Sequence, residues 1–275
     1  DVLVRAAGTG ALSMSVGSSP QDIFLRVHSA QRRPAKGRSR PPHGPRWPPH
    51  ALVFDTETRT DTGQTLTVGV YRRCRLIGDA YVCEEEGLFF GEDADAGERR
   101  LLDQYPDTDD ATIGVTRFPP DLRLRVLDRA SFIERVLWKA VQRGDLIVAF
   151  NLPFDVSRLA VKWSKAKDGG WSLVLSDRLY RKANRVEPNP NRPRIRVTAR
   201  NSQSAFFRLM RPMEPTEWPY NGRFLDLKTL AFALYDKSYS LKRLCKELKI
   251  KGKLKHEPSG RITAREIDYC REDVR

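Results

Sequence analysis

The chain has 275 residues, of which 40% are hydrophobic, so it can bury the core of one large domain or of two modest ones. Its formal net charge of +14 favours an anionic partner, with nucleic acid ahead of an acidic membrane surface. No apolar run approaches the roughly 20 residues needed to cross a bilayer, which argues against a transmembrane protein. The N-terminus lacks the apolar region of a signal peptide, and the four cysteines form no C-x-x-C pair or zinc-binding spacing, so we expect reduced thiols in a cytoplasmic protein.

Residues 1–50 differ in composition from the rest of the chain. Residues 1–27 are low in charge and predict no defined structure. The segment Arg32–His50 carries six Arg or Lys residues, repeated Pro and no acid, and such a composition cannot bury enough apolar surface to fold alone. We expect a disordered or weakly ordered linker, with a basic arm that contacts nucleic-acid phosphates as the alternative. The folded domain should therefore span residues 51–275.

The first candidate site follows the apolar run Ala51–Phe54. This run predicts a buried β-strand, and it ends in Asp55 and Glu57. Side chains alternate between the two faces of a strand, so both carboxylates point the same way. Two like charges at the end of a buried strand repel each other and resist desolvation, and a divalent cation would offset both costs. For this motif taken alone, a solvated acidic turn is the alternative.

Short connections predict an antiparallel meander after this strand. Thr65–Arg73 is rich in Thr and Val, which predicts a second strand, and Tyr81–Phe90 predicts a third, interrupted one. The segment Glu92–Asp110 is strongly acidic, so we expect an exposed loop. A helix is then predicted over Ser131–Arg143, with apolar side chains at helical spacing, its first residue as the cap and a Gly as the stop.

The second candidate acid, Asp155, lies at a strand-to-helix junction. The continuous apolar run Leu146–Phe150 predicts a strand that is buried on both faces of a mixed or parallel sheet. Pro153 suits the first turn of the helix that follows, and we expect that helix to continue over Val156–Lys165. Asp155 could serve a metal site, or it could act only as a first-turn acid that favours the helix dipole.

Residues 171–221 form a basic insertion that we expect to contain a β-hairpin. Strands are predicted over Ser172–Ser176 and Arg194–Thr198, and a Pro-rich basic segment joins them. The apolar run Ala205–Met210 has no clear type. After the insertion, Phe224–Leu227 predicts a further short strand, and a helix follows it.

An amphipathic helix is predicted over Ser240–Leu248, in a strongly basic part of the chain. We expect Lys242 and Arg243 on this helix to contact nucleic-acid phosphates, since they add to a global excess of positive charge. A solvated charged face is the alternative.

The last helix opens at Thr263 with a capping-box pattern. It carries Tyr269 and Asp273, which are spaced by four residues and so lie on one face. The sequence given ends two residues after Asp273, which we interpret as a truncated helix in a fragment of a longer protein.

Four carboxylates from three separated elements therefore stand out: Asp55, Glu57, Asp155 and Asp273, with Tyr269 one turn before the last. Each lies at the end or edge of apolar structure, which is hard to explain for independent surface acids. Oxygen ligands suit Mg²⁺ or Mn²⁺. Two such ions roughly 4 Å apart can hold the attacking and leaving oxygens of a phosphodiester displacement. A nearby phenol can orient the attacking water or take its proton.

The three motifs, in this order, resemble those of the DEDD (DnaQ-like) 3′–5′ exonucleases. The motif D-x-E matches Asp55–Glu57, N-x-x-[FY]-D matches Asn151–Asp155, and Y-x-x-x-D matches Tyr269–Asp273. Three motifs in order are far more specific than any one of them. Because Tyr269 is present and no His stands at position 268, the chain is similar to the tyrosine subclass, which includes the proofreading domains of DNA polymerases. The segment Phe224–Leu241 is also similar to part of the family B proofreading domains.

This resemblance implies a ribonuclease H-like α/β fold, with a five-stranded mixed β-sheet whose first three strands are antiparallel and with flanking α-helices. It implies two Mg²⁺ or Mn²⁺ ions held by the four acids, and Tyr269 beside the nucleophilic water. We assign Asn151 and Phe154 of the second motif, with the basic pair Lys242 and Arg243, to nucleic-acid binding. The implied reaction is hydrolysis at the 3′ end of single-stranded or frayed DNA, and both a proofreading module of a larger polymerase and a stand-alone exonuclease are open.

Two other functions remain open at the level of the sequence. Trimming of RNA 3′ ends would use the same residues. A catalytically silent nucleic-acid-binding module is possible, although such a module has no need to hold all four acids and the tyrosine. Binding to a membrane surface lacks support, because the sequence predicts no basic amphipathic helix with an aromatic face.

Overall fold

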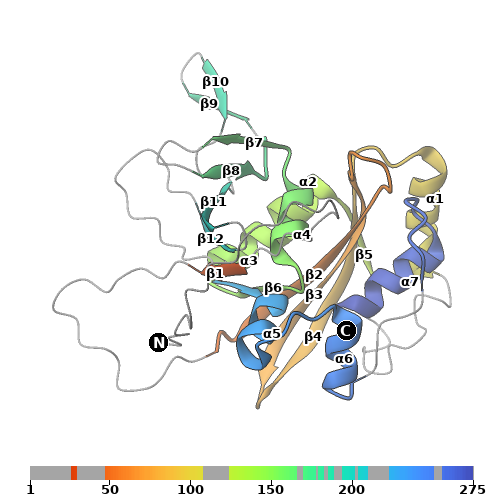
Figure 1. Ribbon diagram of the computed structural model, residues 1–275. Coiled ribbons are helices and arrows are strands. Elements are labelled where there is room, and N and C mark those ends of the chain that lie inside the picture. Colours follow the sequence, from red (N-terminus) through yellow and green to blue (C-terminus); the bar gives the residue numbers. More distant parts are fainter. Residues whose placement is uncertain are drawn as a thin grey trace, which may run out of the picture.

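The structure of the protein is a computed structural model in which the chain is described over residues 26–29, 47–107, 124–165, 170–177, 179–182, 185–188, 194–201, 204–209, 223–250 and 256–274. Within these ranges the chain forms a mixed six-stranded β-sheet with helices on both faces, and a five-stranded sheet stands beside it (Figure 1). The fold is therefore α/β, as predicted. No helix in the described part of the chain is long and apolar enough to cross a membrane.

The six-stranded sheet has the strand order β13-β6-β2-β3-β4-β5. Its strands are β2 His50–Thr58, β3 Leu66–Ile77, β4 Ala80–Phe90, β5 Arg125–Asp128, β6 Leu146–Ala149 and β13 Arg223–Asp226. The meander β2-β3-β4 is antiparallel, which confirms the prediction. The sheet has one strand more than the five expected, because the short strand β5 pairs in parallel with the edge of β4. No local sequence pattern predicts this pairing.

Parallel pairing at the other side of the sheet decides where the candidate acids gather. β6 runs parallel to β2, and β13 runs parallel to β6. All four residues of β6 are buried, as its continuous apolar run predicts. Because parallel strands end at the same edge of a sheet, the carboxyl ends of β2, β6 and β13 lie together, and ligand-binding residues of α/β proteins collect at this edge.

The helices cover both faces of the sheet. They are α1 Ala96–Gln104, α2 Arg129–Ser131, α3 Trp138–Arg143, α4 Leu152–Leu159, α5 Leu227–Tyr235, α6 Leu241–Glu247 and α7 Ala264–Asp273, with a π-helical segment Phe132–Leu137 between α2 and α3 and a 3₁₀ turn Tyr105–Asp107 after α1. In Figure 1, α2, α3 and α4 lie on one side of the sheet, and α1 and α7 lie on the other.

Each face of the sheet has its own apolar core. On the α2–α4 face, the Phe132 ring stacks on Phe89 with 3.9 Å between ring centroids, and Tyr71 packs beside it. Glycine makes room for these rings: a Cβ at Gly69 would lie 2.1 Å from the Phe89 ring, and one at Gly87 would lie 2.5 Å from the Tyr71 ring. The opposite core joins the other side chains of β3 and β4 to α1 and α7.

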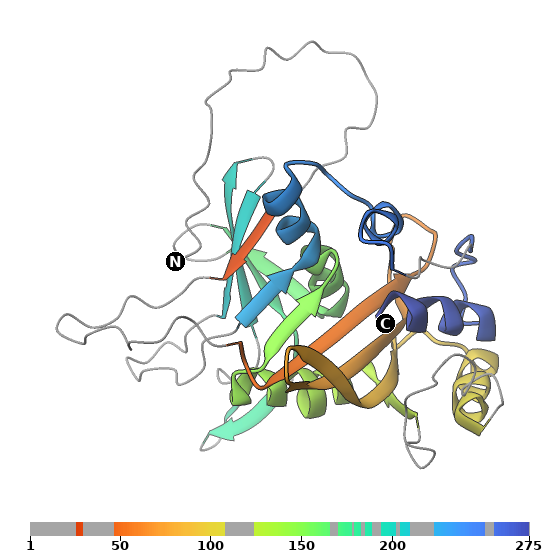
Figure 2. The same cartoon turned by 90° about the horizontal axis from the view of Figure 1, so that it is seen from below.

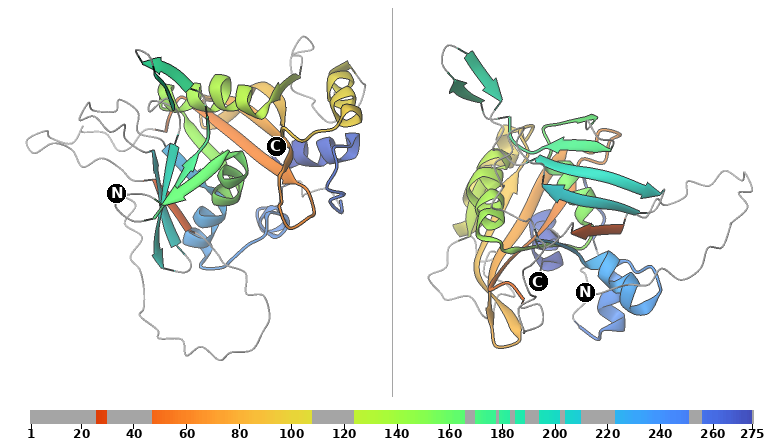
Figure 3. Two further views of the ribbon diagram at one scale, coloured as in Figure 1. Left: turned by 90° about the horizontal axis from the view of Figure 1, so that it is seen from above. Right: turned by 90° about the vertical axis from the view of Figure 1, so that its left-hand side faces the viewer.

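The basic insertion contributes strands to a second sheet of order β1-β12-β11-β8-β7. These strands are β1 Arg26–Ser29, β7 Lys162–Lys165, β8 Trp171–Val174, β11 Arg194–Asn201 and β12 Ser204–Leu209, and a separate hairpin joins β9 Leu179–Lys182 to β10 Arg185–Pro188. Figures 2 and 3 show this sheet beside the central one, and the right view of Figure 3 shows the hairpin projecting from the molecule. The predicted strands of the insertion are confirmed, and the run of unclear type over Ala205–Met210 falls largely within β12.

The N-terminal segment predicted to be disordered lies mostly outside the described residues. Within it, β1 pairs in parallel with β12, and β2 begins at His50. All four cysteines are free thiols, and Cys74 of β3 stands directly opposite Cys83 of β4 in the antiparallel ladder.

Two predicted helix boundaries are wrong. The helix expected to be capped by Ser131 begins instead at Arg129, because the Asp128 carboxylate accepts the Ser131 backbone N–H at 2.7 Å and caps the helix earlier. The helix expected to run to Lys165 ends at Leu159. There the backbone becomes extended, and Lys162–Lys165 pairs with β8 as strand β7, so strand pairing overrides the local helical pattern.

The acidic segment Glu92–Asp110 is not simply an exposed loop. Its residues 96–104 form α1, which begins with a capping box: Asp95 accepts the Glu98 backbone N–H, and Glu98 accepts the Asp95 backbone N–H. Leu102 is buried in the core beneath α7. Acids that look like loop residues in the sequence therefore cap and anchor a helix.

Candidate metal centre

Asp55 and Glu57 lie at the carboxyl end of β2, as predicted, and both side chains are half-buried. The pairing of β2 with β3 shifts register between Thr56 and Thr58, so Glu57 lies opposite one extra residue of β3. Cys270 of α7 lies over this strand end, and its thiol is 3.8 Å from the Asp55 Oδ2. One ligand atom from each of Asp55, Glu57 and Cys270 lies within 4.8 Å of the others.

Asp155 lies in the first turn of α4, directly after β6, and only 2% of it is exposed. The Thr56 hydroxyl donates to its Oδ1 at 2.7 Å. Its Oδ2 is buried and has no hydrogen-bond partner among the described residues. Burial raises the pKa of this carboxyl well above its usual value, and the negative charges of Asp55 and then Asp226 raise it further. A buried carboxylate oxygen without a donor is the feature that a bound cation would satisfy.

The negative charges of the four predicted acids all act on one buried thiol, that of Cys270. Burial raises the pKa of the Cys270 thiol well above its usual value, and the carboxylates of Asp55, Glu57, Asp273 and Asp155 raise it further. All four acids therefore lie within electrostatic reach of a single side chain, although they come from β2, α4 and α7. Of these acids, Asp55 and Glu57 each place a carboxylate oxygen within 4.8 Å of the Cys270 thiol.

Tyr269 is buried next to Cys270, and one turn of α7 separates it from Asp273. Its ring packs against the ring of His256, with 4.9 Å between centroids. His256 is itself held by a 2.8 Å contact between its Nε2 and the buried Glu266 carboxylate. The sequence singled out the tyrosine but not the histidine that orients it.

A buried cluster of charged and polar side chains holds α7 against the sheet. The Glu86 carboxylate of β4 accepts from Arg271 of α7 and from Arg72 of β3, with the latter contact at 2.7 Å. Arg271 also donates to the Tyr105 hydroxyl at 3.1 Å, and that hydroxyl donates to Asp268. Arg271 lies between Tyr269 and Asp273 in the sequence, so its anchoring fixes the orientation of both.

A second cluster, formed by Arg59, Glu98, Gly260 and Ile262, holds the segment that leads into α7. Arg59 follows β2 and donates through two nitrogens to the two Glu98 oxygens, at 2.7 and 2.8 Å. The same arginine donates to the Gly260 carbonyl at 3.0 Å, and the Ile262 N–H donates to Glu98 at 3.0 Å. These hydrogen bonds lower the pKa of Glu98 to about 2, with the arginine as the largest cause. The end of β2 and the start of α7 are thereby tied to α1.

Asp226, at the end of β13, is a site residue that the sequence reasoning missed. It is buried, it accepts the Leu152 N–H at 3.0 Å and the Thr229 N–H at 2.9 Å, and its charge acts on Asp155. It therefore holds the first turn of α4 in place. The available signal was an apolar strand that ends in an acid, the same pattern that identified Asp55.

The residues assigned to nucleic-acid binding are divided between two places. Asn151 and Phe154 begin α4 beside Asp155, and Arg158 lies over the Phe154 ring at 4.9 Å. Lys242 and Arg243 are exposed on α6, and Arg243 lines a cavity of about 470 Å³ together with Lys237 and Lys246. The predicted amphipathic helix is confirmed as α6, whereas contact with a nucleic acid stays a prediction.

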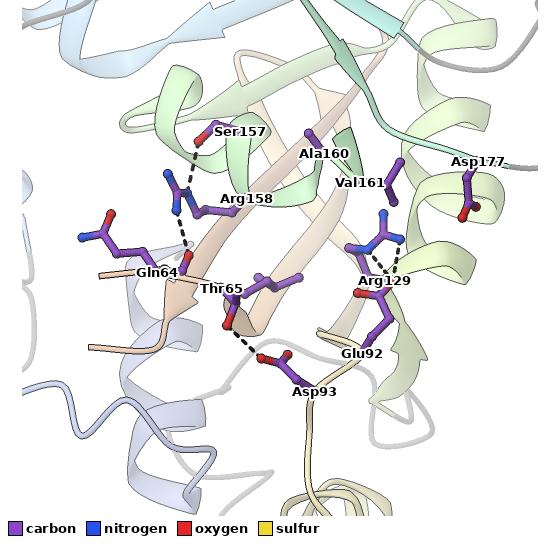
Figure 4. A pocket seen from close by; sticks show the side chains of 12 residues that line it. Gln64, Thr65, Glu92, Asp93, Arg129, Ser157, Arg158, Ala160, Val161 and Asp177 are labelled. Atoms are coloured by element: carbon purple, nitrogen blue, oxygen red, sulfur yellow. Dashed lines mark hydrogen bonds and ion pairs between the residues drawn. The ribbon is translucent and has the colours of Figure 1, made fainter. Parts of the chain in front are cut away.

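A larger cavity, of about 620 Å³, is lined by residues that follow the first two motifs in the chain, and none of the four candidate acids lines it. It is bounded by the turn between β2 and β3, by the residues that follow α4, and by Arg129 (Figure 4). Arg158 crosses one side of it and donates to the Gln64 carbonyl at 2.7 Å. Arg129 donates to the Glu92 carboxylate on the other side, at 2.7 Å.

Comparison with protein-family models and with curated proteins found no match for the chain. The assignment of a function therefore depends on the residues and their arrangement.

Proposed function

We propose that this chain is a metal-dependent 3′–5′ exonuclease domain that hydrolyses phosphodiester bonds at the 3′ end of DNA. One observation carries the proposal. Four carboxylates from three motifs act electrostatically on one buried thiol over the carboxyl end of β2, and one of their oxygens, Asp155 Oδ2, is buried without a donor among the described residues. Like charges at a shared, partly dry site are costly unless cations bind there.

The fold supports this proposal. An antiparallel meander followed by parallel strands, with helices on both faces, is compatible with the ribonuclease H-like fold that we propose for the domain. The three motifs occupy the elements that the proposal requires, since D-x-E ends β2, the second motif opens α4, and the third lies on α7.

The residues present fit Mg²⁺ or Mn²⁺. Carboxylate oxygens are the ligands that these ions prefer, and the residues that would hold two ions are Asp55, Glu57, Asp155 and Asp273. Cys270 is fully buried, and its thiol lies 3.9 Å from the Asp55 backbone carbonyl, so we assign it to orienting Asp55. Bound ions would supply a water of lowered pKa and stabilise the charge that develops on the phosphate.

The protein's own residues supply position. Thr56 donates a hydrogen bond to Oδ1 of Asp155, and Oδ2 of the same carboxylate is left to bind a metal ion. Tyr269, fixed by His256, would orient the attacking water beside the acids. Phe154 and Asn151 would meet the terminal nucleotide at the start of α4, and Lys242 and Arg243 would meet phosphates farther along the strand. In a proofreading setting, a polymerase would deliver the frayed 3′ end.

Degradation of single-stranded DNA tests the proposal. A 5′-labelled oligonucleotide should shorten from its 3′ end in the presence of Mg²⁺ or Mn²⁺, and chelation should stop the reaction. Asp55→Asn and Asp155→Asn should each lose activity by at least about 100-fold, because each removes charge where the transition state needs it. Asp177→Asn changes an exposed acid that lines the larger cavity and should retain activity.

Three results would contradict the proposal. The first is that the folded wild-type chain leaves the oligonucleotide intact. The second is that a 3′-phosphorothioate end fails to block shortening, and the third is that the Asn variants have the same activity as the wild type. An RNA oligonucleotide of the same sequence separates DNA proofreading from RNA trimming, and binding without any cleavage would indicate a silent module.

A further inference from the structure

Two tryptophans on neighbouring strands of the second sheet are largely exposed. Trp163 of β7 is 66% exposed and Trp171 of β8 is 47% exposed. Their rings meet edge to face, with 5.0 Å between centroids and an interplanar angle of 85°. Exposed tryptophans are uncommon on soluble proteins, and two in contact form an apolar patch of the kind that marks a binding surface.

The register of the sheet explains how these rings come to lie together. Trp163 pairs with Leu173, and Lys165 pairs with Trp171. Paired residues in an antiparallel ladder share a face, so both tryptophans and Lys165 lie on one face of the sheet. Farther into the sheet that face is buried, because Leu173 packs against the main core. Trp163 lies on the edge strand β7, and Trp171 is the first residue of the neighbouring strand β8.

A purely structural role accounts for part of this arrangement. Cross-strand aromatic pairs stabilise β-hairpins, and an edge-to-face contact between the two rings does so here. That contact uses the edge of one indole against the face of the other, and it leaves 66% of Trp163 and 47% of Trp171 exposed. All four residues of β7 are exposed, and Lys165 places positive charge on the face that carries the two rings.

We propose that Trp163 and Trp171, with Lys165, form a stacking surface for the bases of a single-stranded nucleic acid. The choice of partner rests on charge complementarity and on the proposed function. Aromatic faces stack on unpaired bases of any sequence, and a neighbouring lysine attracts the phosphates. The chain's net charge of +14 favours an anionic partner of this kind over a neutral or basic protein.

The position of β7 in the chain links this surface to the candidate metal centre. Only Ala160 and Val161 separate β7 from α4, the helix that carries Asp155. Both residues line the larger cavity, together with Ser157 and Arg158 of α4 (Figure 4). A single strand that stacks on the tryptophans is therefore bound to the segment that continues from the second motif. Such a surface would bind substrate nucleotides away from the scissile bond.

Binding in the absence of metal tests the inference separately from catalysis. Fluorescence anisotropy of a labelled oligothymidylate, with the whole chain in EDTA, measures affinity alone. The double change Trp163→Ala and Trp171→Ala should weaken binding by about 5- to 150-fold, the range for loss of one stacked base. Phe at both positions should restore most of the affinity. Ile77→Ala is the control, since Ile77 is an apolar residue that is 51% exposed and lies at the end of β3.

A small substrate distinguishes failure of this inference from failure of the proposed function. The p-nitrophenyl ester of thymidine 5′-monophosphate carries one base, so it is too small to contact the candidate metal centre and the two tryptophans at once. If the chain is an exonuclease, the double variant should cleave this ester at the wild-type rate and lose affinity only for the oligonucleotide. Equal oligonucleotide affinity for the folded double variant and the wild type overturns the inference, whatever the catalytic result. A change in self-association without a change in oligonucleotide affinity would show that the patch binds a second copy instead, and would overturn it as well.

Discussion

Replacing Glu98 by Gln tests how much the cluster of Arg59, Glu98, Gly260 and Ile262 contributes to the free energy of unfolding. The change keeps the shape of the side chain and removes the charge that Arg59 pairs with in two hydrogen bonds. Folding lowers the pKa of Glu98 from 4.5 to about 2, chiefly through that arginine. At about 1.4 kcal/mol for each pKa unit, the charged form contributes about 3 kcal/mol to stability at neutral pH.

The sign of the pH dependence follows from the direction of the pKa change. A carboxyl whose pKa is lowered by folding stabilises the protein above its unfolded pKa, and this contribution is lost as the pH falls toward the folded pKa. The contribution of Glu98 should therefore fall from about 3 kcal/mol at pH 6 to about 1 kcal/mol at pH 3. Urea unfolding of wild type and Glu98→Gln across this range measures it as the difference between the two unfolding free energies.

The control lies on the same helix. Asp103 is an exposed acid of α1, and Asp103→Asn should change stability by no more than about 0.5 kcal/mol at either pH. A difference between wild type and Glu98→Gln that stays constant with pH would refute the electrostatic argument. A difference below about 1 kcal/mol at pH 6 would show that the start of α7 does not depend on this cluster.

Three further substitutions test other parts of the structure. Thr56→Val removes the hydroxyl that donates to Asp155, and it should weaken Mn²⁺ binding about 10-fold, measured by calorimetry, with little change in unfolding by urea. Glu86→Gln leaves the buried Arg271 without its carboxylate, and it should cost about 3 to 5 kcal/mol in urea unfolding. Gly69→Ala places a Cβ 2.1 Å from the aromatic ring opposite it, and it should cost about 1 to 3 kcal/mol, seen as a lowered Tm. Values near zero for either of the last two would contradict the packing described for α7 and for the core.

The sequence predicted those parts of the fold whose signals are local. β2 and β6 are apolar runs that end in polar residues, and α7 opens with a capping residue at Thr263, whose side chain accepts the Glu266 N–H. The three motifs lie on these elements or directly after them, so the candidate acids could be named before their geometry was known. Their convergence follows from the parallel pairing of β6 with β2.

The parts that the sequence did not predict depend on contacts between distant residues. The helix expected through Lys165 ends early because the Val161 N–H donates to the Val174 carbonyl and β7 pairs with β8. The acids at Asp95 and Glu98 look like loop residues until Arg59 and Ile262 are placed beside them. Nothing local marks such partners, because they are brought together only when the two faces of the sheet are covered.

Titration of Mn²⁺ into the metal-free chain tests the central claim most directly, because bound and free Mn²⁺ are distinguished by the electron paramagnetic resonance of the free ion. The account predicts saturable binding of about two ions per chain in the wild type and in Asp177→Asn, and loss of at least one in Asp55→Asn and in Asp155→Asn. No saturable binding by the folded wild type, or equal binding by all four proteins, would contradict the claim that the acids at the end of β2 form a metal centre.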